Sequence, residues 1–163
     1  KPWATCGHGM ARPHNVVNSL YLTAEDLDAL NRERYERYAV IKENEQEAEC
    51  YRTEDADIVL VAYGASARIA RSAVNAARDA GIKAGLVRPI TLWPFPERAV
   101  DAQVDGAKAF LVVEMSMGQM VEDVRLVVEG RVPVEFYGRA GGMVPTPEEV
   151  LARILEINER IGE

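Results

Sequence analysis

Two uninterrupted apolar runs, residues 58–64 and 109–115, dominate the hydrophobic pattern of this chain. A run without polar alternation is typical of a strand covered on both faces, as in a parallel sheet. Further strands are expected at residues 83–88 and 134–137, and a short edge strand is expected at residues 48–52. The pattern therefore predicts four strands, with residues 48–52 as a candidate edge strand.

Between these strands, apolar residues recur at helical spacing. One helix is expected to start with Ser66 as its N-cap. A short helix should follow with Pro96 at its first helical position. Gly118 opens a third helix, and Thr146 begins a fourth, in which Glu149 completes a capping box. The predicted core face of the third helix comprises Met120, Val121, Val124, Val127 and Val128.

The alternation of strand and helix from residue 57 onward predicts parallel strands joined by right-handed crossovers, in an α/β sandwich. Residues 1–22 resemble a loop, and a helix should begin near Thr23. Arg34 interrupts the apolar stripe of that helix, so it is expected to lie along a surface or a partner subunit. We expect a connecting segment at residues 1–56 and an α/β domain at residues 57–163.

The chain has 163 residues and a formal net charge of −7. It has no basic stripe, so nucleic-acid binding is disfavoured, and no apolar run long enough to span a bilayer. Two cysteines do not make a disulfide framework, and the cytoplasm is the expected compartment. The opening Lys1-Pro2-Trp3 suggests a piece of a longer protein, made by design or by proteolysis.

Two turns that follow strands are candidate sites. Gly64 and Ser66 lie where free helical N–H groups could hold an anion, although a plain turn and helix cap is favoured. Glu114 ends a strand and could serve as a general base, but the sequence places no partner acid or nucleophile near it. Met115 and Met117 are expected at a contact surface, the alternative being that they fill the core as Met120 does.

Other chemistry-bearing residues fit no common site. Cys6, His8 and His14 are metal-ligand types, but their spacing matches no common zinc site. Arg88 ends a strand and could meet a carboxylate or phosphate, and an ion pair within the chain is the favoured alternative. The candidate switch-point or subunit-interface residues are Gly64, Ser66, Arg88, Trp93, Glu114, Met115, Met117, Gly118 and Gln119.

A series of segments resembles the C-terminal part of one subunit of the 2-oxoacid:ferredoxin oxidoreductases, the subunit that also carries the pyrimidine-binding domain. The similarity is closest to the 2-ketoisovalerate branch, with the 2-oxoglutarate enzymes next, and it covers essentially the whole chain. Residues 1–5 and 18–21 resemble the connecting segment before that domain. The segments that carry the resemblance are residues 58–69, 81–83, 88–96, 112–125, 136–139 and 145–149.

The resemblance implies a three-layer α/β/α sandwich like the C-terminal domain of transketolases. Its five-stranded sheet would have the order 1-3-2-4-5, with the first strand antiparallel. The loops after residues 63 and 114 would then meet at a topological switch point. The family oxidises 2-oxoacids to acyl-CoA with thiamine diphosphate, magnesium and iron–sulfur clusters, and passes electrons to ferredoxin.

The chain lacks the motifs that hold those cofactors, so neither cofactors nor catalytic residues are assigned to it. It is expected to be a structural part of a complex, inactive alone, with other subunits, ferredoxin and CoA as partners, and with a homodimer left open. One alternative is a stand-alone module that binds a nucleotide or CoA group at the switch-point cleft. Another is the C-terminal domain of a transketolase or of a 2-oxoacid dehydrogenase β subunit.

Overall fold

The protein is described by a computed structural model that covers residues 7–162. The residues Lys1-Pro2-Trp3 and Cys6 lie outside this part. The chain divides into two compact units, Lys1–Ala39 and Val40–Glu163. Among the described residues, no helix is both long enough and apolar enough to cross a membrane.

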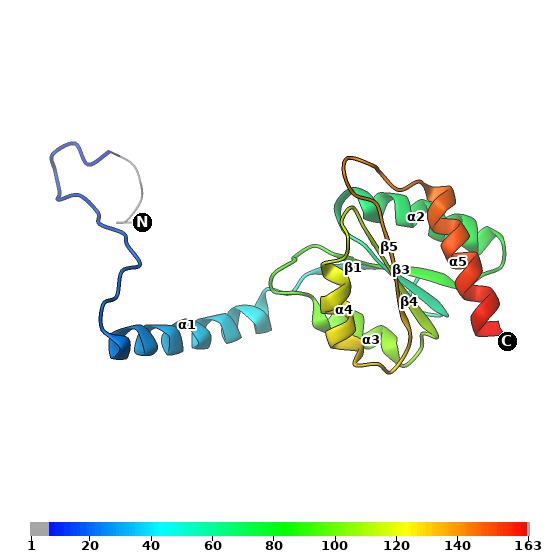
Figure 1. Ribbon diagram of the computed structural model, residues 1–163, viewed down its shortest axis with the longest axis horizontal. Coiled ribbons are helices and arrows are strands. Elements are labelled where there is room, and N and C mark those ends of the chain that lie inside the picture. The colour runs from blue at the N-terminus through cyan, green and yellow to red at the C-terminus, as the bar shows by residue number, and fades with distance from the viewer. Residues whose placement is uncertain (1–6, 163) are drawn as a thin grey trace. The chain divides into compact units, whose positions relative to one another are not determined.

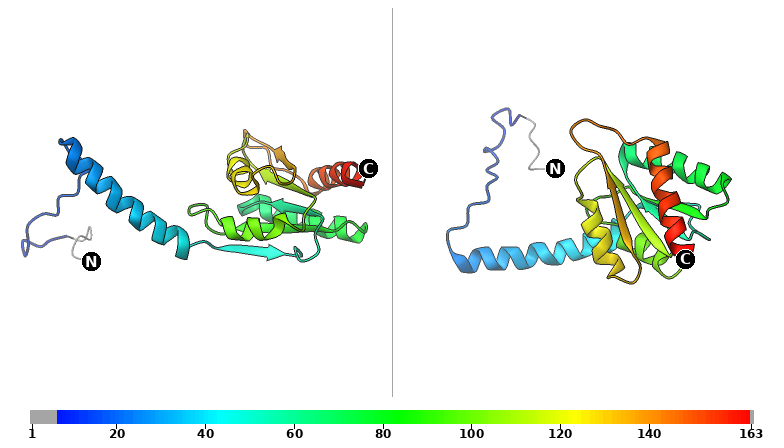
Figure 2. Two further views of the ribbon diagram at one scale, coloured as in Figure 1. Left: turned by 90° about the horizontal axis from the view of Figure 1, so that it is seen from below. Right: turned by 45° about the vertical axis from the view of Figure 1, so that its right-hand side comes forward.

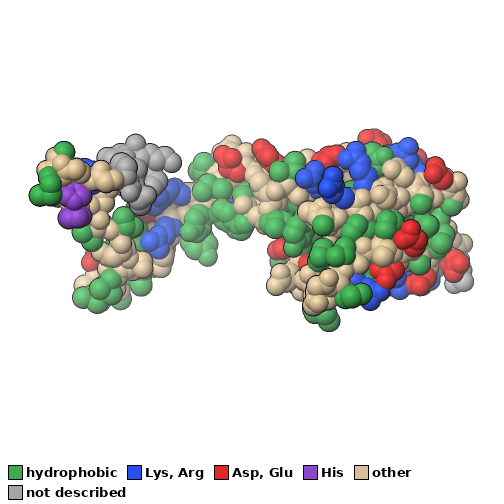
Figure 3. All heavy atoms as spheres, turned by 90° about the horizontal axis from the view of Figure 1, so that it is seen from above, with side chains coloured by type: hydrophobic (Ala, Val, Ile, Leu, Met, Phe, Trp, Pro, Cys, Tyr) green, Lys and Arg blue, Asp and Glu red, His purple; other side chains and the backbone are tan. Residues whose placement is uncertain are grey.

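The first unit has no buried helical side chains. Helix α1 (Ala24–Asn44) begins in this unit and ends in the second, and none of its residues is buried. Figure 3 shows hydrophobic side chains at the surface of this part of the chain. The expectation of a helix that lies along a surface or a partner subunit stays a prediction. The large hydrophobic side chains of residues 10–38 that are at least two fifths exposed are Met10, Val16, Val17, Leu20, Tyr21, Leu22, Leu27, Tyr35 and Tyr38.

The second unit is built on one five-stranded sheet with the order β1-β3-β2-β4-β5. β1 is antiparallel to β3, and every other pairing is parallel. This is the predicted topology. The strands are β1 (Ala48–Tyr51), β2 (Ile58–Val61), β3 (Ala84–Pro89), β4 (Ala109–Glu114) and β5 (Val134–Gly138).

Four helices cover the two faces of this sheet and complete three layers. α2 and α5 pack side by side on one face, and α3 and α4 on the other (Figures 1 and 2). The helices are α2 (Gly64–Asp79), α3 (Glu97–Val104), α4 (Met120–Val128) and α5 (Pro147–Gly162).

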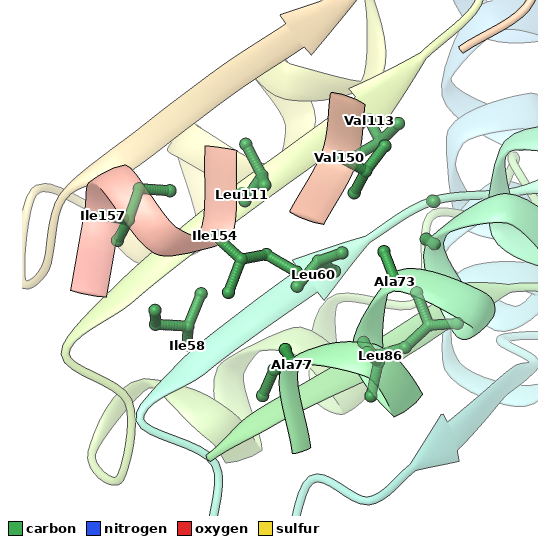
Figure 4. Close-up of a cluster of buried hydrophobic side chains, with 14 of the residues drawn as sticks. Ile58, Leu60, Ala73, Ala77, Leu86, Leu111, Val113, Val150, Ile154 and Ile157 are labelled. Atoms are coloured by element: carbon green, nitrogen blue, oxygen red, sulfur yellow. The ribbon is translucent and has the colours of Figure 1, made fainter. Parts of the chain in front are cut away.

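The apolar runs of β2 and β4 are buried on both faces, as their sequence predicts. Alternate residues serve opposite cores, because side chains of a strand point to opposite faces. Ile58 and Leu60 face α2 and α5, where Ile154 of α5 packs (Figure 4). Val59 and Val61 face α3 and α4. A single short strand thus contributes to both cores.

Three helix starts differ from their prediction, since α4 begins at Met120 with Gln119 as its N-cap and not at Gly118. The N-cap of α2 is Tyr63, whose side chain makes no capping hydrogen bond, and Ser66 is buried in the helix. Ser66 as N-cap is therefore wrong, because the helix begins at once after the β2 strand. Pro96 is the N-cap residue of α3 rather than its first helical residue. The boundary expected between residues 56 and 57 stays a prediction.

A glycine in β3 allows the chain before β2 to pack closely. A Cβ atom at Gly85 would lie 2.6 Å from the Arg52 carbonyl oxygen and 3.0 Å from the Cα of Thr53. Both are backbone atoms, which cannot rotate away. A larger residue at position 85 would therefore collide with the backbone of this segment.

Both edges of the sheet carry a glutamate that two arginines hold. Glu49 of β1 pairs with Arg71 and with Arg88, each at 3.1 Å. Glu135 of β5 pairs with Arg153 at 3.3 Å and with Arg160 at 2.8 Å. The first and last strands therefore present the same kind of charged cluster.

Candidate functional site

Four strand-to-helix junctions lie at the carboxyl edge of the sheet, after β2, β3, β4 and β5, where open α/β sheets usually bind ligands. We call three of them the α2 junction (residues 62–66), the α4 junction (residues 115–119) and the α5 junction (residues 139–146), and the fourth leads from β3 to α3. Each ends at the N-terminus of a helix, where the first N–H groups have no acceptor within the helix. The three junctions differ in which side chains accept hydrogen bonds from these N–H groups.

At the α4 junction, the carboxylate of Glu114 occupies the helix start. The side chain is 1% exposed. It accepts hydrogen bonds from the backbone N–H groups of Met120 at 3.1 Å and Val121 at 3.0 Å. Gln119 donates its N–H at 3.2 Å, and Ser116 donates its hydroxyl at 3.0 Å. All four donors belong to the fold, so this arrangement stabilises α4 rather than offering a base to a substrate.

Gly118 and Gln119 complete this junction. Gly118 has a φ of +105°, a backbone conformation that residues other than glycine rarely adopt. A Cβ atom there would lie 3.2 Å from Val121 Cγ1. The Ser116 hydroxyl also accepts the Gly118 N–H at 3.1 Å. The space beside Gly118 is thus filled by the protein itself.

The α2 junction has no such carboxylate. Tyr63 makes no side-chain capping hydrogen bond, and Gly64 turns the chain with a φ of +57°. A Cβ atom at Gly64 would meet nothing within 4 Å. Ser66, the third helical residue, is 4% exposed. No hydrogen bond from a described side chain caps the start of α2, and Gly64 and Ala65 are exposed there.

The α5 junction is capped at its surface. The Glu149 N–H donates to Thr146 Oγ1 at 3.2 Å, and the Thr146 N–H donates to the Glu149 carboxylate at 3.0 Å. This is the predicted capping box. The Thr146 N–H, and next the Arg139 guanidinium that pairs with this carboxylate, hold the pKa of Glu149 below its ordinary value.

Two loops at the same edge expose large apolar side chains. After β4, Met115 is 44% and Met117 is 84% exposed, whereas Met120 is buried. After β3, Trp93 is 55% exposed, and the Trp93–Pro94 peptide bond is cis. Both loops lead into the helices of one face, since α3 and α4 pack together. We call the exposed set the edge apolar surface: Ile90, Leu92, Trp93, Met115 and Met117.

On the other face, α2 and the strands β1 and β3 enclose a groove that sequence reasoning missed. Arg88, one of the predicted residues, lines it together with Glu49, Arg71 and Arg68. The favoured ion pair of Arg88 within the chain is confirmed, with Glu49 as its partner. The signals in the sequence were Arg68 and Arg71 on one helix face. Their meeting with Glu49 depends on the antiparallel register that places Glu49 opposite Arg88.

The described residues offer little for metal or nucleophilic chemistry. The rings of His8 and His14 lie 4.2 Å apart, but within residues 7–162 no three His, Cys, Asp or Glu side chains are placed to hold a metal ion. Desolvation raises the pKa of the Cys50 thiol. A thiol that stays protonated at neutral pH is a poor nucleophile.

Comparison with known proteins shows the family. Residues 56–150 match the family described as pyruvate:ferredoxin oxidoreductase core domain II. The ketoisovalerate oxidoreductase subunit VorB of Methanothermobacter marburgensis is 45% identical over 155 residues, which are 95% of this chain and 44% of VorB. The 2-oxoglutarate synthase subunit KorA of Methanothermobacter thermautotrophicus is 43% identical over 106 residues, 65% of this chain and 28% of KorA.

Solved structures agree on the fold. A 2-oxoglutarate:ferredoxin oxidoreductase from Magnetococcus marinus matches 86% of this chain and 24% of its own, with a TM-score of 0.67 and 21% identity. A split-gene transketolase matches 68% of this chain and 40% of its own, with a TM-score of 0.57 and 20% identity. The chain spans less than half the length of the curated relatives it matches. On its sequence and its fold, the chain belongs to the pyruvate:ferredoxin oxidoreductase core domain II family, and it is homologous to the VorB and KorA subunits of 2-oxoacid:ferredoxin oxidoreductases.

Proposed function

We propose that this chain forms the core domain II of a subunit whose complex oxidises a 2-oxoacid to an acyl-CoA and reduces ferredoxin. A branched-chain 2-oxoacid such as 3-methyl-2-oxobutanoate is the proposed substrate, with 2-oxoglutarate as the second choice. The observation that carries this proposal is the 45% identity with a ketoisovalerate oxidoreductase subunit over 95% of the chain. The complex would work in the cytoplasm.

The residues of this chain do not fit the cofactors of such a complex. An iron–sulfur cluster is held by four ligands, most often cysteine thiolates, and the chain has two cysteines. Glu114, the buried carboxylate of the site, already accepts four hydrogen bonds from its own fold. Thiamine diphosphate, magnesium and the clusters would therefore bind elsewhere in the complex, and no chemical step is assigned to this chain.

Its role would be assembly, through the edge apolar surface. Trp93 and Met117 are more than half exposed, on two loops that leave the same edge of the sheet, after β3 and β4. Aromatic and methionine side chains are enriched at protein interfaces, and methionine adapts its shape to a partner. The glycine turn and the Glu114 cap hold the Met117 loop in one conformation, which lowers the entropic cost of binding. Another subunit or domain of the complex, or a second copy of this chain, would cover this surface.

The proposal is tested by reconstitution. The chain is co-expressed with the polypeptides encoded beside its gene, and ferredoxin reduction is followed with 3-methyl-2-oxobutanoate or 2-oxoglutarate and CoA. We expect turnover by the complex and none by the isolated chain. Turnover by the isolated chain, stoichiometric micromolar binding of thiamine diphosphate to it, or activity of the complex on sugar phosphates alone would refute the proposal.

The assembly role has its own variants. Trp93→Ser and Met117→Ser should each weaken subunit association about tenfold or more, because truncating a buried interface anchor costs over about 1.4 kcal/mol. Leu126→Ser removes an exposed apolar side chain of α4, whose exposed fraction lies between those of Trp93 and Met117, and should leave association unchanged. Analytical ultracentrifugation of the complexes measures this. Equal association of all three variants and the parent would rule out the edge apolar surface as the interface.

A further inference from the structure

The groove beside α2 is a sizeable cavity with a distinct charge. It has a volume of about 820 Å³ and lies between one side of α2 and the strands β1 and β3. Cavities of this size are within the range of small-molecule sites. The lining includes the side chains of Arg68, Arg71 and Arg88 and a single carboxylate, that of Glu49. The groove therefore carries an excess of positive charge in a chain whose net charge is −7.

Neighbouring side chains hold two of these arginines in place. Glu49 binds Arg71 through one oxygen and Arg88 through the other, each at 3.1 Å. The Arg71 guanidinium also stacks on the Tyr51 ring, 4.0 Å from the ring centroid. Tyr51 is fixed in turn by a hydrogen bond from its hydroxyl to Asn75 at 2.8 Å. Such prior ordering lowers the entropic cost of binding a ligand.

The third arginine completes the basic lining. Arg68 is exposed, and no acidic side chain in the described part of the protein pairs with it. It stands one helical turn after Gly64, and Gly64 and Ala65 also line the groove. Their N–H groups begin α2 and have no capping side chain. Arginine forks and free helix-start N–H groups both bind phosphate oxygens.

From this arrangement we infer that the groove binds a phosphate-bearing anion. A cavity of about 820 Å³ is far larger than one carboxylate, and three guanidinium groups match a ligand with several charged oxygens. Arg71 covers one face of the Tyr51 ring, so that face offers no platform for a nucleobase. Recognition is therefore of the phosphate groups. None of the residues that line the groove belongs to the edge apolar surface, so this inference does not depend on the assembly role.

Inorganic pyrophosphate is the probe. Its binding to the full 163-residue chain is measured by calorimetry, with EDTA present so that no metal bridges the two, and at constant ionic strength. We expect saturable binding at one site. Arg68→Gln should weaken binding about threefold to fivefold, the size expected for one exposed charge pair. Arg125→Gln changes an arginine outside this groove, on α4, and is the matched control that should have no effect.

Glu49→Gln gives a change of opposite sign. It removes the only negative charge among the named lining residues, so pyrophosphate should bind more tightly, again by about threefold to fivefold. A merely structural ion-pair cluster would instead lose thermal stability with no gain in binding. Succinate is the comparison ligand and should bind more weakly than pyrophosphate. The inference is overturned by absence of saturable binding, by equal binding of succinate, or by an Arg125→Gln effect equal to that of Arg68→Gln.

Discussion

The α4 and α2 junctions start from the same geometry and end differently. Both follow a buried parallel strand, and both turn at a glycine with positive φ. At the α4 junction the Glu114 carboxylate binds the helix N–H groups, whereas at the α2 junction no side chain does. A helix start occupied by the protein's own carboxylate is a structural joint. An unoccupied one beside three arginines remains available to a ligand.

Removal of the buried Glu114 carboxylate should have the largest effect on stability. Glu114→Ala should lower the free energy of unfolding by about 3 kcal/mol, because it leaves buried donors without acceptors. Urea denaturation measures the change. Glu122 is an exposed acidic residue of α4, the helix that Glu114 caps. Glu122→Ala is the control and should change the free energy of unfolding by about 0.5 kcal/mol or less. Equal effects of both substitutions would contradict the capping role.

The two glycines allow a matched pair of substitutions. Gly118→Ala should cost about 2 kcal/mol, because it combines an unfavourable φ with a contact of the new Cβ to Val121. Gly64→Ala should cost only about 1 kcal/mol, since the new Cβ meets open space and only the φ is unfavourable. Thermal or urea unfolding gives both values. A larger loss of stability in Gly64→Ala than in Gly118→Ala would contradict the finding that the α2 junction has more space for a side chain.

A carboxylate can also be added to the open junction. Ala65→Asp places a negative charge in the first turn of α2 and should raise stability by about 0.5 kcal/mol. The same change should weaken pyrophosphate binding, because the new carboxylate competes for the same N–H groups. Ala65→Asn is the neutral control and should weaken binding less. Tighter binding in Ala65→Asp would argue against a role of these donors.

The α5 junction provides the smallest effect, one that depends on pH. The pKa of Glu149 is lowered in the fold, so its charged form stabilises the protein above its ordinary pKa of 4.5, and that contribution is lost as the pH falls through the lower folded value. Glu149→Gln should therefore be less stable than the parent at pH 7. The gap should narrow in acid. Urea midpoints measured between pH 7 and pH 3 test this, and a gap that is independent of pH would refute it.

Much of the fold followed from the hydrophobic pattern. The runs that became β2 and β4 have no polar interruption, and the capping box at Thr146 and Glu149 marks the start of α5 without any tertiary information. The sheet order came from the family resemblance instead. Pattern alone misplaced Ser66, because a serine after a glycine resembles a cap until the backbone shows that the helix has already begun.

The sites were harder to predict, for a physical reason. The role of Glu114 depends on three backbone N–H groups five to seven residues later, which only the turn at Gly118 brings back to it. The groove depends on strands distant in the chain, since Glu49 meets Arg88 by antiparallel pairing and Arg71 by helix packing. Long-range register is not encoded in local spacing. The exposure of Met115 and Met117 was predicted from the local sequence and is confirmed.

The glutamates held by arginines on β1 and β5 also bear on solubility. An exposed strand edge can template the addition of a foreign strand, which is a route to fibrils. Here each outermost strand is short, and its glutamate already pairs with two arginines of the same fold. A strand arriving at either edge would have to disturb that cluster and dehydrate its charges. These charged clusters therefore disfavour edge-to-edge aggregation at both edges of the sheet.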